Sequence, residues 1–308
     1  MATFYRRLPR FDYIMPKTLD EALKTLNKYK GSSKLLAGGT DLVLQLKKRE
    51  RTMPEYVIDL KGIPGLDQLS YDTDGLKIGA LTTISAIEQS PEVCREFPIL
   101  AQAALLMASP QVRNRATFVG NICNAAASAD SAPSLLVLSA SVKIKSTRKE
   151  RIIPMEQFFT GPGTTALKTN EMVMGISVPK QVSGTRGVYL KLSPRHSMDL
   201  AIVGVAVSGI CQNGLCEDVR IALGAVAPTP MRVAGAEAIL KGRKISSELI
   251  DEAARSAMNE CNPRKDSYRA SPEYRRDMVY VMTRRALNQI LVQQSGGQNE
   301  ADNNRGKR

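Results

Sequence analysis

The sequence predicts an α+β protein in three parts, and three features of the chain support this class. Over residues 11–179, short apolar or β-branched segments typical of strands alternate with amphipathic segments that carry helix caps. Over residues 180–292, three apolar strand segments precede two helical segments, as in an antiparallel sheet with helices on one face. Two glycine-centred stretches, about eighty residues apart, each follow an apolar segment.

The first part, residues 1–60, contains a helix with a clear start signal. Thr18 and Glu21 form a capping box, in which the Thr18 side chain accepts from the Glu21 N–H while Glu21 reaches back. Gly31 is expected to end this helix. The other expected elements are a strand at 34–37, a helix capped by Thr40 or Asp41 that ends near residue 48, and a strand at 56–60.

The second part, residues 61–179, is larger and mixes both element types. Thr82 or Thr83 is expected to cap a helix at 84–89. The second glycine stretch, at 116–122, is expected to be a loop after an Ala- and Leu-rich helix. The remaining expected elements are helices at 98–108 and 134–139, strands at 76–80, 141–146 and 172–178, and a rigid turn at 161–163.

The third part, residues 180–292, is expected to form a separate α+β domain. Its strands are expected at 188–192, 201–211 and 219–224, and its helices at 247–260 and 272–293. The tail at 293–308 is polar and rich in Gly and Asn, which predicts disorder.

The net charge of +13 raises the question of nucleic-acid binding. The basic residues are spread along the chain, however, and the densest run, at 47–51, contains an acidic residue. No aromatic residues are interleaved with that run for base stacking. We therefore expect no nucleic acid, and attribute the charge to a polyanionic cofactor or an acidic partner subunit.

Cysteine content and hydropathy limit which cellular locations and which metal sites we expect for this chain. The chain has five cysteines at sparse spacing and no C-x2-C-x2-C run, so we expect reduced thiols and no metal or iron–sulfur cluster in this chain. No apolar run reaches the ~20 residues of a membrane-spanning helix. The first ten residues lack the apolar core of a secretory signal, so a cytoplasmic location is expected.

The two glycine stretches suggest a phosphate site. Small residues and free main-chain N–H groups can bind a phosphate without lysine side chains. Two such loops suggest a ligand with two phosphates. A single glycine loop is weak evidence, because an ordinary strand-to-helix turn has the same composition.

Four motifs in order resemble one family over residues 1 to about 292. They are L-A-G-G-T-D-L at 36–42, S-P-Q-V-R-N-R-A-T at 109–117, V-G-N-I at 119–122 and D-S-A-P at 130–133. The chain resembles the FAD-binding medium subunits of molybdenum hydroxylases, the family of aerobic carbon monoxide dehydrogenase and xanthine dehydrogenase. The resemblance implies an FAD-binding fold of the vanillyl-alcohol-oxidase-like (PCMH) type, with subdomains at 1–60 and 61–179, followed by a C-terminal α+β domain at 180–292.

The resemblance also implies a role in electron transfer. Electrons would pass from a [2Fe-2S] cluster on a small partner subunit through non-covalent FAD to an external electron acceptor. Substrate would be oxidised at a molybdopterin cofactor in a large partner subunit, within a dimer of heterotrimers. This chain would then be an oxidoreductase component with no catalytic residue and no metal of its own.

Individual site residues follow from the same resemblance. It implies that the first loop wraps the FAD pyrophosphate, that the second forms the opposite wall, and that Val173 contacts the flavin. These cofactor-binding residues are Leu36, Ala37, Gly38, Gly39, Thr40, Asp41, Leu42, Thr117, Val119, Gly120, Asn121 and Val173. Relatives often have a second glycine where this chain has Val119, so the Val119 side chain must point away from the ligand.

Four further residues are implied by the resemblance, and three of them have a simpler alternative. Asp130 matches an aspartate that holds FAD hydroxyl groups, although it is also placed to cap a helix. Lys191 matches a lysine near the flavin, where a cation raises the reduction potential; the alternative is a solvated lysine. Met107 stands where a relative has an aromatic ring, and Tyr189 is a candidate to cover the flavin or else a core residue.

A second function stays open from the sequence. The same fold could act as a stand-alone flavin-dependent oxidase or reductase, which would need its own base near the flavin. The only histidine, His196, has no evident catalytic partner and is expected in a loop. The substrate and the terminal acceptor (NAD, quinone, oxygen or a carrier) are not indicated.

Overall fold

The computed structural model describes residues 7–49, 53–195 and 197–292. The chain divides into two compact units, each assembled from separate stretches of sequence. Unit 1 comprises Met1–Ser90, Ala108–Ala125 and Ala140–Lys180. Unit 2 comprises Pro91–Met107, Ala126–Ser139 and Gln181–Arg308. The expected tail at 293–308 and His196 lie outside the described residues.

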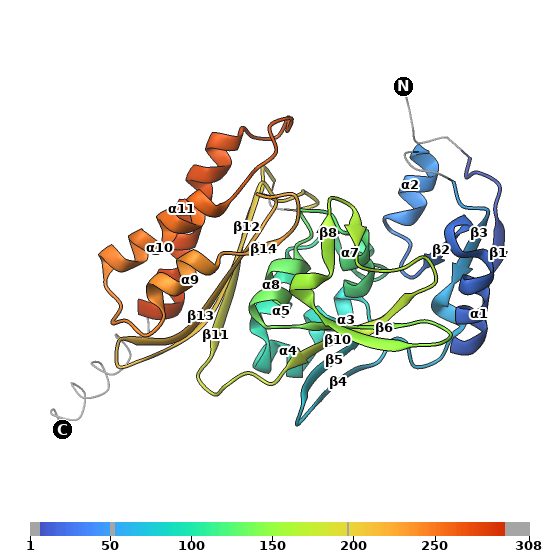
Figure 1. Cartoon of the computed structure of the whole chain (residues 1–308), viewed down its shortest axis with the longest axis horizontal. Helices are drawn as coiled ribbons and strands as arrows, with labels where there is room; N and C mark the ends of the chain where they lie inside the picture. The colour runs from blue at the N-terminus through green and yellow to red at the C-terminus, as the bar shows by residue number, and fades with distance from the viewer. Residues whose placement is uncertain (1–6, 50–52, 196, 293–308) are drawn as a thin grey trace. The chain divides into compact units, whose positions relative to one another are not determined.

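Unit 1 contains a small parallel sheet in the strand order β1-β3-β2. Helix α1 covers it with Ala22, Leu23 and Leu26, which share one face because Leu26 follows Ala22 by four residues and Leu23 by three. Leu36 pairs with Asp59 at the end of the β2–β3 ladder, so the segments that follow both strands leave the same edge of the sheet. The elements are β1 (Asp12–Ile14), α1 (Leu19–Tyr29), η2 (Lys30–Ser32), β2 (Ser33–Leu36), α2 (Leu42–Lys48), β3 (Tyr56–Asp59) and η3 (Leu60–Gly62) (Figure 1).

A second, antiparallel sheet of unit 1 has the order β4-β5-β10-β6-β7. One face is buried, as the alternation of Leu76 and Ile78 with Lys77 requires. Helix α7 packs against β10 and the β8–β9 hairpin. The elements are β4 (Leu69–Asp72), β5 (Gly75–Gly79), α3 (Ile84–Gln89), α6 (Pro110–Arg113), α7 (Phe118–Asn124), β6 (Ser141–Lys145), β7 (Glu150–Pro154), η4 (Met155–Gln157), β8 (Phe159–Gly161), β9 (Thr164–Thr165) and β10 (Met172–Pro179).

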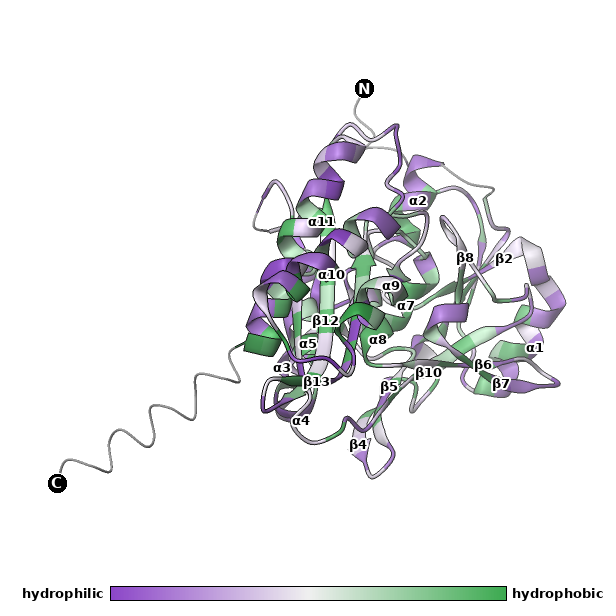
Figure 2. Ribbon diagram, turned by 60° about the vertical axis from the view of Figure 1, so that its left-hand side comes forward, coloured by the Kyte–Doolittle hydropathy of each residue, from purple (hydrophilic) through white to green (hydrophobic). Residues whose placement is uncertain are grey.

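Unit 2 is built around the antiparallel sheet β11-β12-β13-β14. Val203, Val205 and Val207 of β12 join a core with helices α9, α10 and α11 on one face. Helices α5 and α8, from earlier in the chain, pack against strands of the same sheet. Figure 2 shows hydrophobic residues concentrated along β12 and hydrophilic residues along much of α10. The elements are α4 (Pro91–Glu96), α5 (Pro98–Leu105), α8 (Ser131–Val137), β11 (Arg186–Leu192), β12 (Val203–Gln212), β13 (Leu215–Gly224), β14 (Met231–Arg232), α9 (Ala234–Leu240), α10 (Ser247–Glu260), α11 (Pro272–Leu287) and the π-helical η5 (Asn288–Val292).

Most expected elements are present, and the differences have local causes. The 116–122 stretch is largely helical, because the Thr117 side chain caps α7 and Gly120 lies inside that helix. Glu21 accepts from the Lys17 N–H at 2.8 Å rather than from Thr18. The helix expected at 98–108 ends at Leu105, because the chain turns through Ala108 at φ 45° before Pro110. α1 ends at Tyr29, before Gly31.

The α+β class with a C-terminal antiparallel sheet and helices is confirmed. The second face of that sheet is covered by α5 and α8, which the sequence assigns to the 61–179 part. The subdomain boundaries at 60 and 179 stay a prediction.

Candidate functional site

The first glycine loop lies between β2 and α2 of unit 1. Gly39 adopts φ +80°, the left-handed region that side chains disfavour. Among the described residues, no acceptor is found for the main-chain N–H groups of Gly38, Gly39 or Thr40. Asp41 precedes α2 but its side chain makes no cap hydrogen bond. The loop therefore presents consecutive unpaired N–H groups, the arrangement that binds anions.

The two glycine stretches meet within unit 1. A Cβ on Gly38 would lie 2.0 Å from the Arg115 carbonyl oxygen and 2.8 Å from the Ala116 Cα. Ala116 in turn accepts from the Ile84 N–H at 2.9 Å. Gly38 is therefore required by main-chain packing between the two stretches, whereas the sequence suggested only an approach to phosphate.

In the second stretch, some main-chain N–H groups find acceptors within the stretch itself. Gly120 donates its N–H to the Thr117 side-chain oxygen at 2.8 Å, and the Asn121 N–H donates to the Thr117 carbonyl at 3.0 Å. Val119 is 5% exposed, so its side chain is directed into the protein. Nearby, Asn124 accepts from the Gln45 side chain at 2.9 Å, which joins α7 to α2.

A buried polar cluster lies in unit 2. Asp130 accepts from the Tyr189 hydroxyl at 2.8 Å and from the Lys191 ammonium group at 2.8 Å. Lys191 also donates to the Leu106 carbonyl at 3.0 Å. Its side chain is only 5% exposed, so the alternative of a solvated lysine is wrong. Asp130 makes no cap hydrogen bond to α8, and its carboxylate accepts instead from these two partners.

Burial sets the protonation chemistry of this cluster. It raises the pKa of Asp130, and the Coulombic attraction and hydrogen bonds of Lys191 and Tyr189 oppose that rise. Burial, with the neighbouring Asp130, raises the pKa of Tyr189 well above its ordinary value, so the phenol stays a hydrogen-bond donor. The ring has room because Gly204, on the adjacent strand, has no side chain: a Cβ there would lie 2.8 Å from the Tyr189 hydroxyl.

Comparison with known proteins places the chain in a family. Residues 9–181 match the family described as the FAD binding domain in molybdopterin dehydrogenase, and residues 188–290 match the CO dehydrogenase flavoprotein C-terminal domain. The chain belongs to the FAD-binding subunits of molybdenum hydroxylases.

Relatives of this FAD-binding subunit match over nearly its whole length. The carbon monoxide dehydrogenase medium chain of Hydrogenophaga pseudoflava is 36% identical over 91% of this chain and 96% of its own. The xanthine dehydrogenase FAD-binding subunit of an Escherichia coli strain is 33% identical over 92% of this chain and 97% of its own. A solved structure of the Hydrogenophaga pseudoflava carbon monoxide dehydrogenase superposes with a TM-score of 0.89 at 36% identity, covering 92% of this chain and 98% of that one.

In this FAD-binding subunit the predicted site residues fall into two groups, one in each unit. Unit 1 holds Leu36, Ala37, Gly38, Gly39, Thr40, Asp41, Leu42, Thr117, Val119, Gly120, Asn121 and Val173, and unit 2 holds Met107, Asp130, Tyr189 and Lys191. Val173 is 4% exposed on β10, next to a bulge. Met107 is 5% exposed. Both groups suit FAD chemically, because main-chain N–H groups bind phosphate and a carboxylate accepts from hydroxyl groups.

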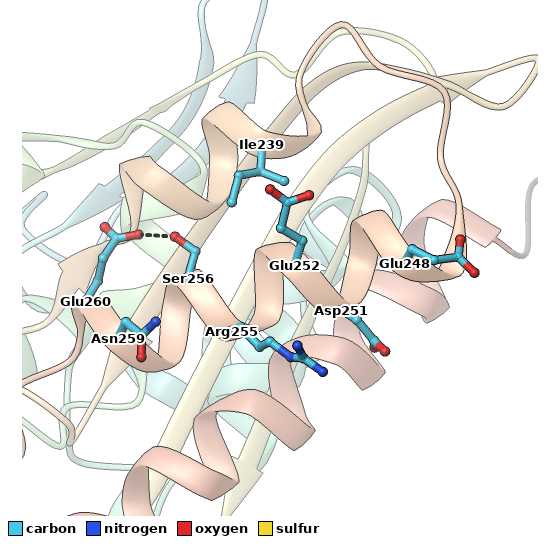
Figure 3. Close-up of a pocket in the computed structure, with 8 residues that line it drawn as sticks. All are labelled: Ile239, Glu248, Asp251, Glu252, Arg255, Ser256, Asn259 and Glu260. Atoms are coloured by element: carbon cyan, nitrogen blue, oxygen red, sulfur yellow. Dashed lines mark hydrogen bonds between the residues drawn. The ribbon is translucent and has the colours of Figure 1, made fainter.

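One surface hollow of unit 2 does not suit an anionic dinucleotide. It has a volume of about 680 Å³ and lies beside α9 and α10 (Figure 3). Its lining carries the carboxylates of Glu248, Asp251, Glu252 and Glu260 against the single cation Arg255, and this net negative charge would repel phosphate. Glu260 is already used, because it accepts from the Ala236 N–H at 3.0 Å and from Ser256 at 3.1 Å. None of the predicted site residues lines this hollow.

Sequence reasoning missed one cation at the glycine loop. The Lys61 ammonium group donates to the Ala37 carbonyl at 3.3 Å and contacts Asp59 at 2.8 Å. The sequence indicates the position of Lys61 only indirectly. Lys61 follows β3, and β3 pairs in parallel with β2, the strand that leads into the glycine loop. Elsewhere in the described ranges, no group of three or more His, Cys, Asp or Glu side chains is arranged to hold a metal ion, and no helix is long and apolar enough to cross a membrane.

Proposed function

We propose that this chain binds FAD non-covalently and carries electrons from a partner's [2Fe-2S] cluster through the flavin to an external acceptor. The matches to both family domains across residues 9–181 and 188–290 support this role. So do the relatives' descriptions, an FAD-binding subunit of xanthine dehydrogenase and a medium chain of carbon monoxide dehydrogenase.

The partners are proposed on the same basis. A large subunit would hold molybdopterin and oxidise the substrate, a small subunit would hold the [2Fe-2S] clusters, and the assembly would be a dimer of heterotrimers. A cytoplasmic location, expected from the sequence, is part of this proposal.

The glycine loop of unit 1 is proposed to hold the FAD pyrophosphate. The unpaired N–H groups of Gly38, Gly39 and Thr40 are the single observation that carries the assignment. Thr40 adds a hydroxyl donor, and Gly39 keeps side-chain atoms out of the space beside the loop. In the second stretch we assign a smaller share of the binding to Gly120, since its N–H is already bonded to Thr117.

The unit 2 cluster is proposed to bind FAD hydroxyl groups and to adjust the flavin electrostatically. A carboxylate can accept about four hydrogen bonds, so Asp130 keeps capacity beyond Tyr189 and Lys191. FAD, when bound, supplies the chemistry of accepting and releasing electrons singly or in pairs. Lys191 supplies a fixed positive charge whose effect is moderated by Asp130.

Reconstitution of the chain tests the proposal. The chain, expressed alone, is stripped of flavin, titrated with FAD, and assayed for flavin content and for reduction by a reduced [2Fe-2S] protein. We expect one FAD per chain and reduction by the iron–sulfur donor, with no turnover of small organic substrates. Vigorous substrate oxidation by the isolated chain would support the stand-alone oxidase instead. A chain that stays colourless under all reconstitution conditions would refute both.

A further inference from the structure

A chain of polar contacts leads from the β1 strand to the glycine loop of unit 1. The Tyr13 hydroxyl donates to Asp59 Oδ2 at 2.5 Å. Asp59 Oδ1 accepts from the Lys61 ammonium group at 2.8 Å and from the Lys61 main-chain N–H at 2.9 Å. The ammonium group also donates to the Ala37 carbonyl at 3.3 Å. The series therefore ends on the main chain immediately before Gly38.

The carboxylate in this series is held as an anion. Asp59 is 3% exposed, and burial alone would raise its pKa. Hydrogen bonds from Lys61 and Tyr13 outweigh that effect and lower the pKa of Asp59 below its ordinary value. Lys61 is itself 37% exposed at its side chain, so without Asp59 a flexible lysine would spread over many rotamers. Asp59 thus fixes the position of the Lys61 cation.

The position of that cation determines the orientation of one peptide group. The described chain contains no cis peptide bonds, so the Ala37 carbonyl and the Gly38 N–H point in opposite directions. Lys61 holds the carbonyl end. The Arg115 carbonyl lies against the Gly38 Cα and restrains the peptide from another side. The Gly38 N–H, which has no acceptor among the described residues, is therefore turned away from Lys61 and kept available.

We propose that Lys61 is a positioning residue for the FAD pyrophosphate, which fixes the Ala37–Gly38 peptide so that the Gly38 N–H faces the ligand. Asp59 and Tyr13 hold the Lys61 ammonium group in place. A carbonyl turned the other way would direct its lone pairs at the phosphate and repel it. This inference rests on the proposed function, because it takes the glycine loop as the pyrophosphate site.

Binding measurements on the full-length chain test the role of Lys61. The flavin-free forms of the wild type, Lys61→Met and Lys61→Arg are titrated with FAD, with ADP and with riboflavin, which lacks phosphate. We expect Lys61→Met to weaken the binding of FAD and of ADP alike, by about ten- to a hundredfold, because one charge-assisted hydrogen bond contributes roughly that factor to affinity. Riboflavin binding should be unchanged, and Lys61→Arg should restore most of the loss because it keeps the cation.

Two further variants separate positioning from general effects. Lys77→Met is the matched control, since Lys77 also pairs with an aspartate, Asp72 at 2.6 Å, on an exposed part of unit 1. Its affinities should equal those of the wild type. Tyr13→Phe removes one hydroxyl from an exposed side chain and so preserves folding. It should also lower the affinities for FAD and ADP, by about two- to fivefold, because Asp59 loses one of the hydrogen bonds that hold it in place.

The outcomes are distinct for the two proposals. Wild-type affinity for FAD and ADP in Lys61→Met and Tyr13→Phe would overturn the role of Lys61 and leave the proposed function standing. A loss in Lys61→Met that is equal for FAD, ADP and riboflavin would also overturn it, because a general structural defect does not distinguish phosphate-bearing ligands. A wild-type chain that binds no FAD would remove the proposed function and this inference with it.

Discussion

Replacing Lys191 by methionine tests whether the unit 2 cluster is a true buried ion pair. Methionine keeps an unbranched stem of similar length but removes the charge together with the ammonium group's hydrogen bonds to Asp130 and to the Leu106 carbonyl. In the wild type, the ammonium group lies 2.8 Å from Asp130 and 3.0 Å from the Leu106 carbonyl, with side chains 5% and 10% exposed for Lys191 and Asp130. Removal leaves the Asp130 carboxylate buried with the Tyr189 hydroxyl as its one remaining side-chain donor among the described residues.

The expected loss of stability is large. Breaking a buried ion pair by deleting one partner costs about 3–5 kcal/mol, because the other charge stays in a low-dielectric environment. Urea denaturation of the flavin-free chain, followed by circular dichroism, measures the free energy of unfolding. The double variant Lys191→Met/Asp130→Asn removes both charges, and it should recover at least half of the loss.

The pH dependence of the stability of Lys191→Met tests the same reasoning a second way. Burial raises the pKa of Asp130 even in the wild type, and without Lys191 that pKa rises further. In the window above the unfolded aspartate pKa of about 3.9, the folded variant then binds a proton that the unfolded chain has lost. Stability therefore falls as pH rises through this window, so the deficit relative to the wild type should shrink from about pH 7.5 to about pH 5.

Two results would refute this reasoning. A loss smaller than about 1 kcal/mol in Lys191→Met would mean that the pair behaves as an exposed salt bridge. A deficit that is constant with pH, or a double variant as unstable as the single one, would mean that the loss comes from packing and not from an unpaired carboxylate.

Two glycine substitutions test the first loop against matched controls. Gly38→Ala should destabilise the chain by about 1–3 kcal/mol or more, because its Cβ would lie 2.0 Å from a main-chain oxygen. Gly31→Ala is the control: its Cβ would have no atom within 4 Å, so stability should change by less than about 0.5 kcal/mol. Equal thermal midpoints for the two variants would contradict the contact with Arg115. Gly39→Ala and Gly65→Ala both place a side chain at φ near +80° and should each lose about 1–2 kcal/mol in chemical denaturation. Gly39→Ala should lose the more of the two, because its Cβ would also lie 2.9 Å from the Leu36 Cδ1 atom, whereas a Cβ on Gly65 meets no atom within 4 Å. Only Gly39→Ala should also lower FAD affinity in a fluorescence titration, and unchanged affinity there would remove the loop from the phosphate site.

Much of the local structure could be predicted because it depends on neighbouring residues. Thr83 and Thr117 cap helices by accepting from N–H groups three residues ahead, Ala86 and Gly120. The cap at Thr83 was among the expected ones. The 116–122 stretch is expected to be a loop because its small residues and main-chain N–H groups suit a phosphate site. The Thr117 cap and the packing of α7 against β10 outweigh the cost of about 1 kcal/mol for a glycine within a helix.

The sequence by itself determined the class of the protein, its family and the order of its motifs, since these depend on residue types and spacing along one chain. Only the tertiary structure decided which distant groups meet. Lys191 and Asp130 are 61 positions apart, and Lys61 and Ala37 are 24 apart. Each pair is brought together by how the strands and helices pack within a unit, and no local propensity encodes that path. The same packing decided that Gly38 must be glycine, because a main-chain oxygen of another segment occupies the space of its Cβ.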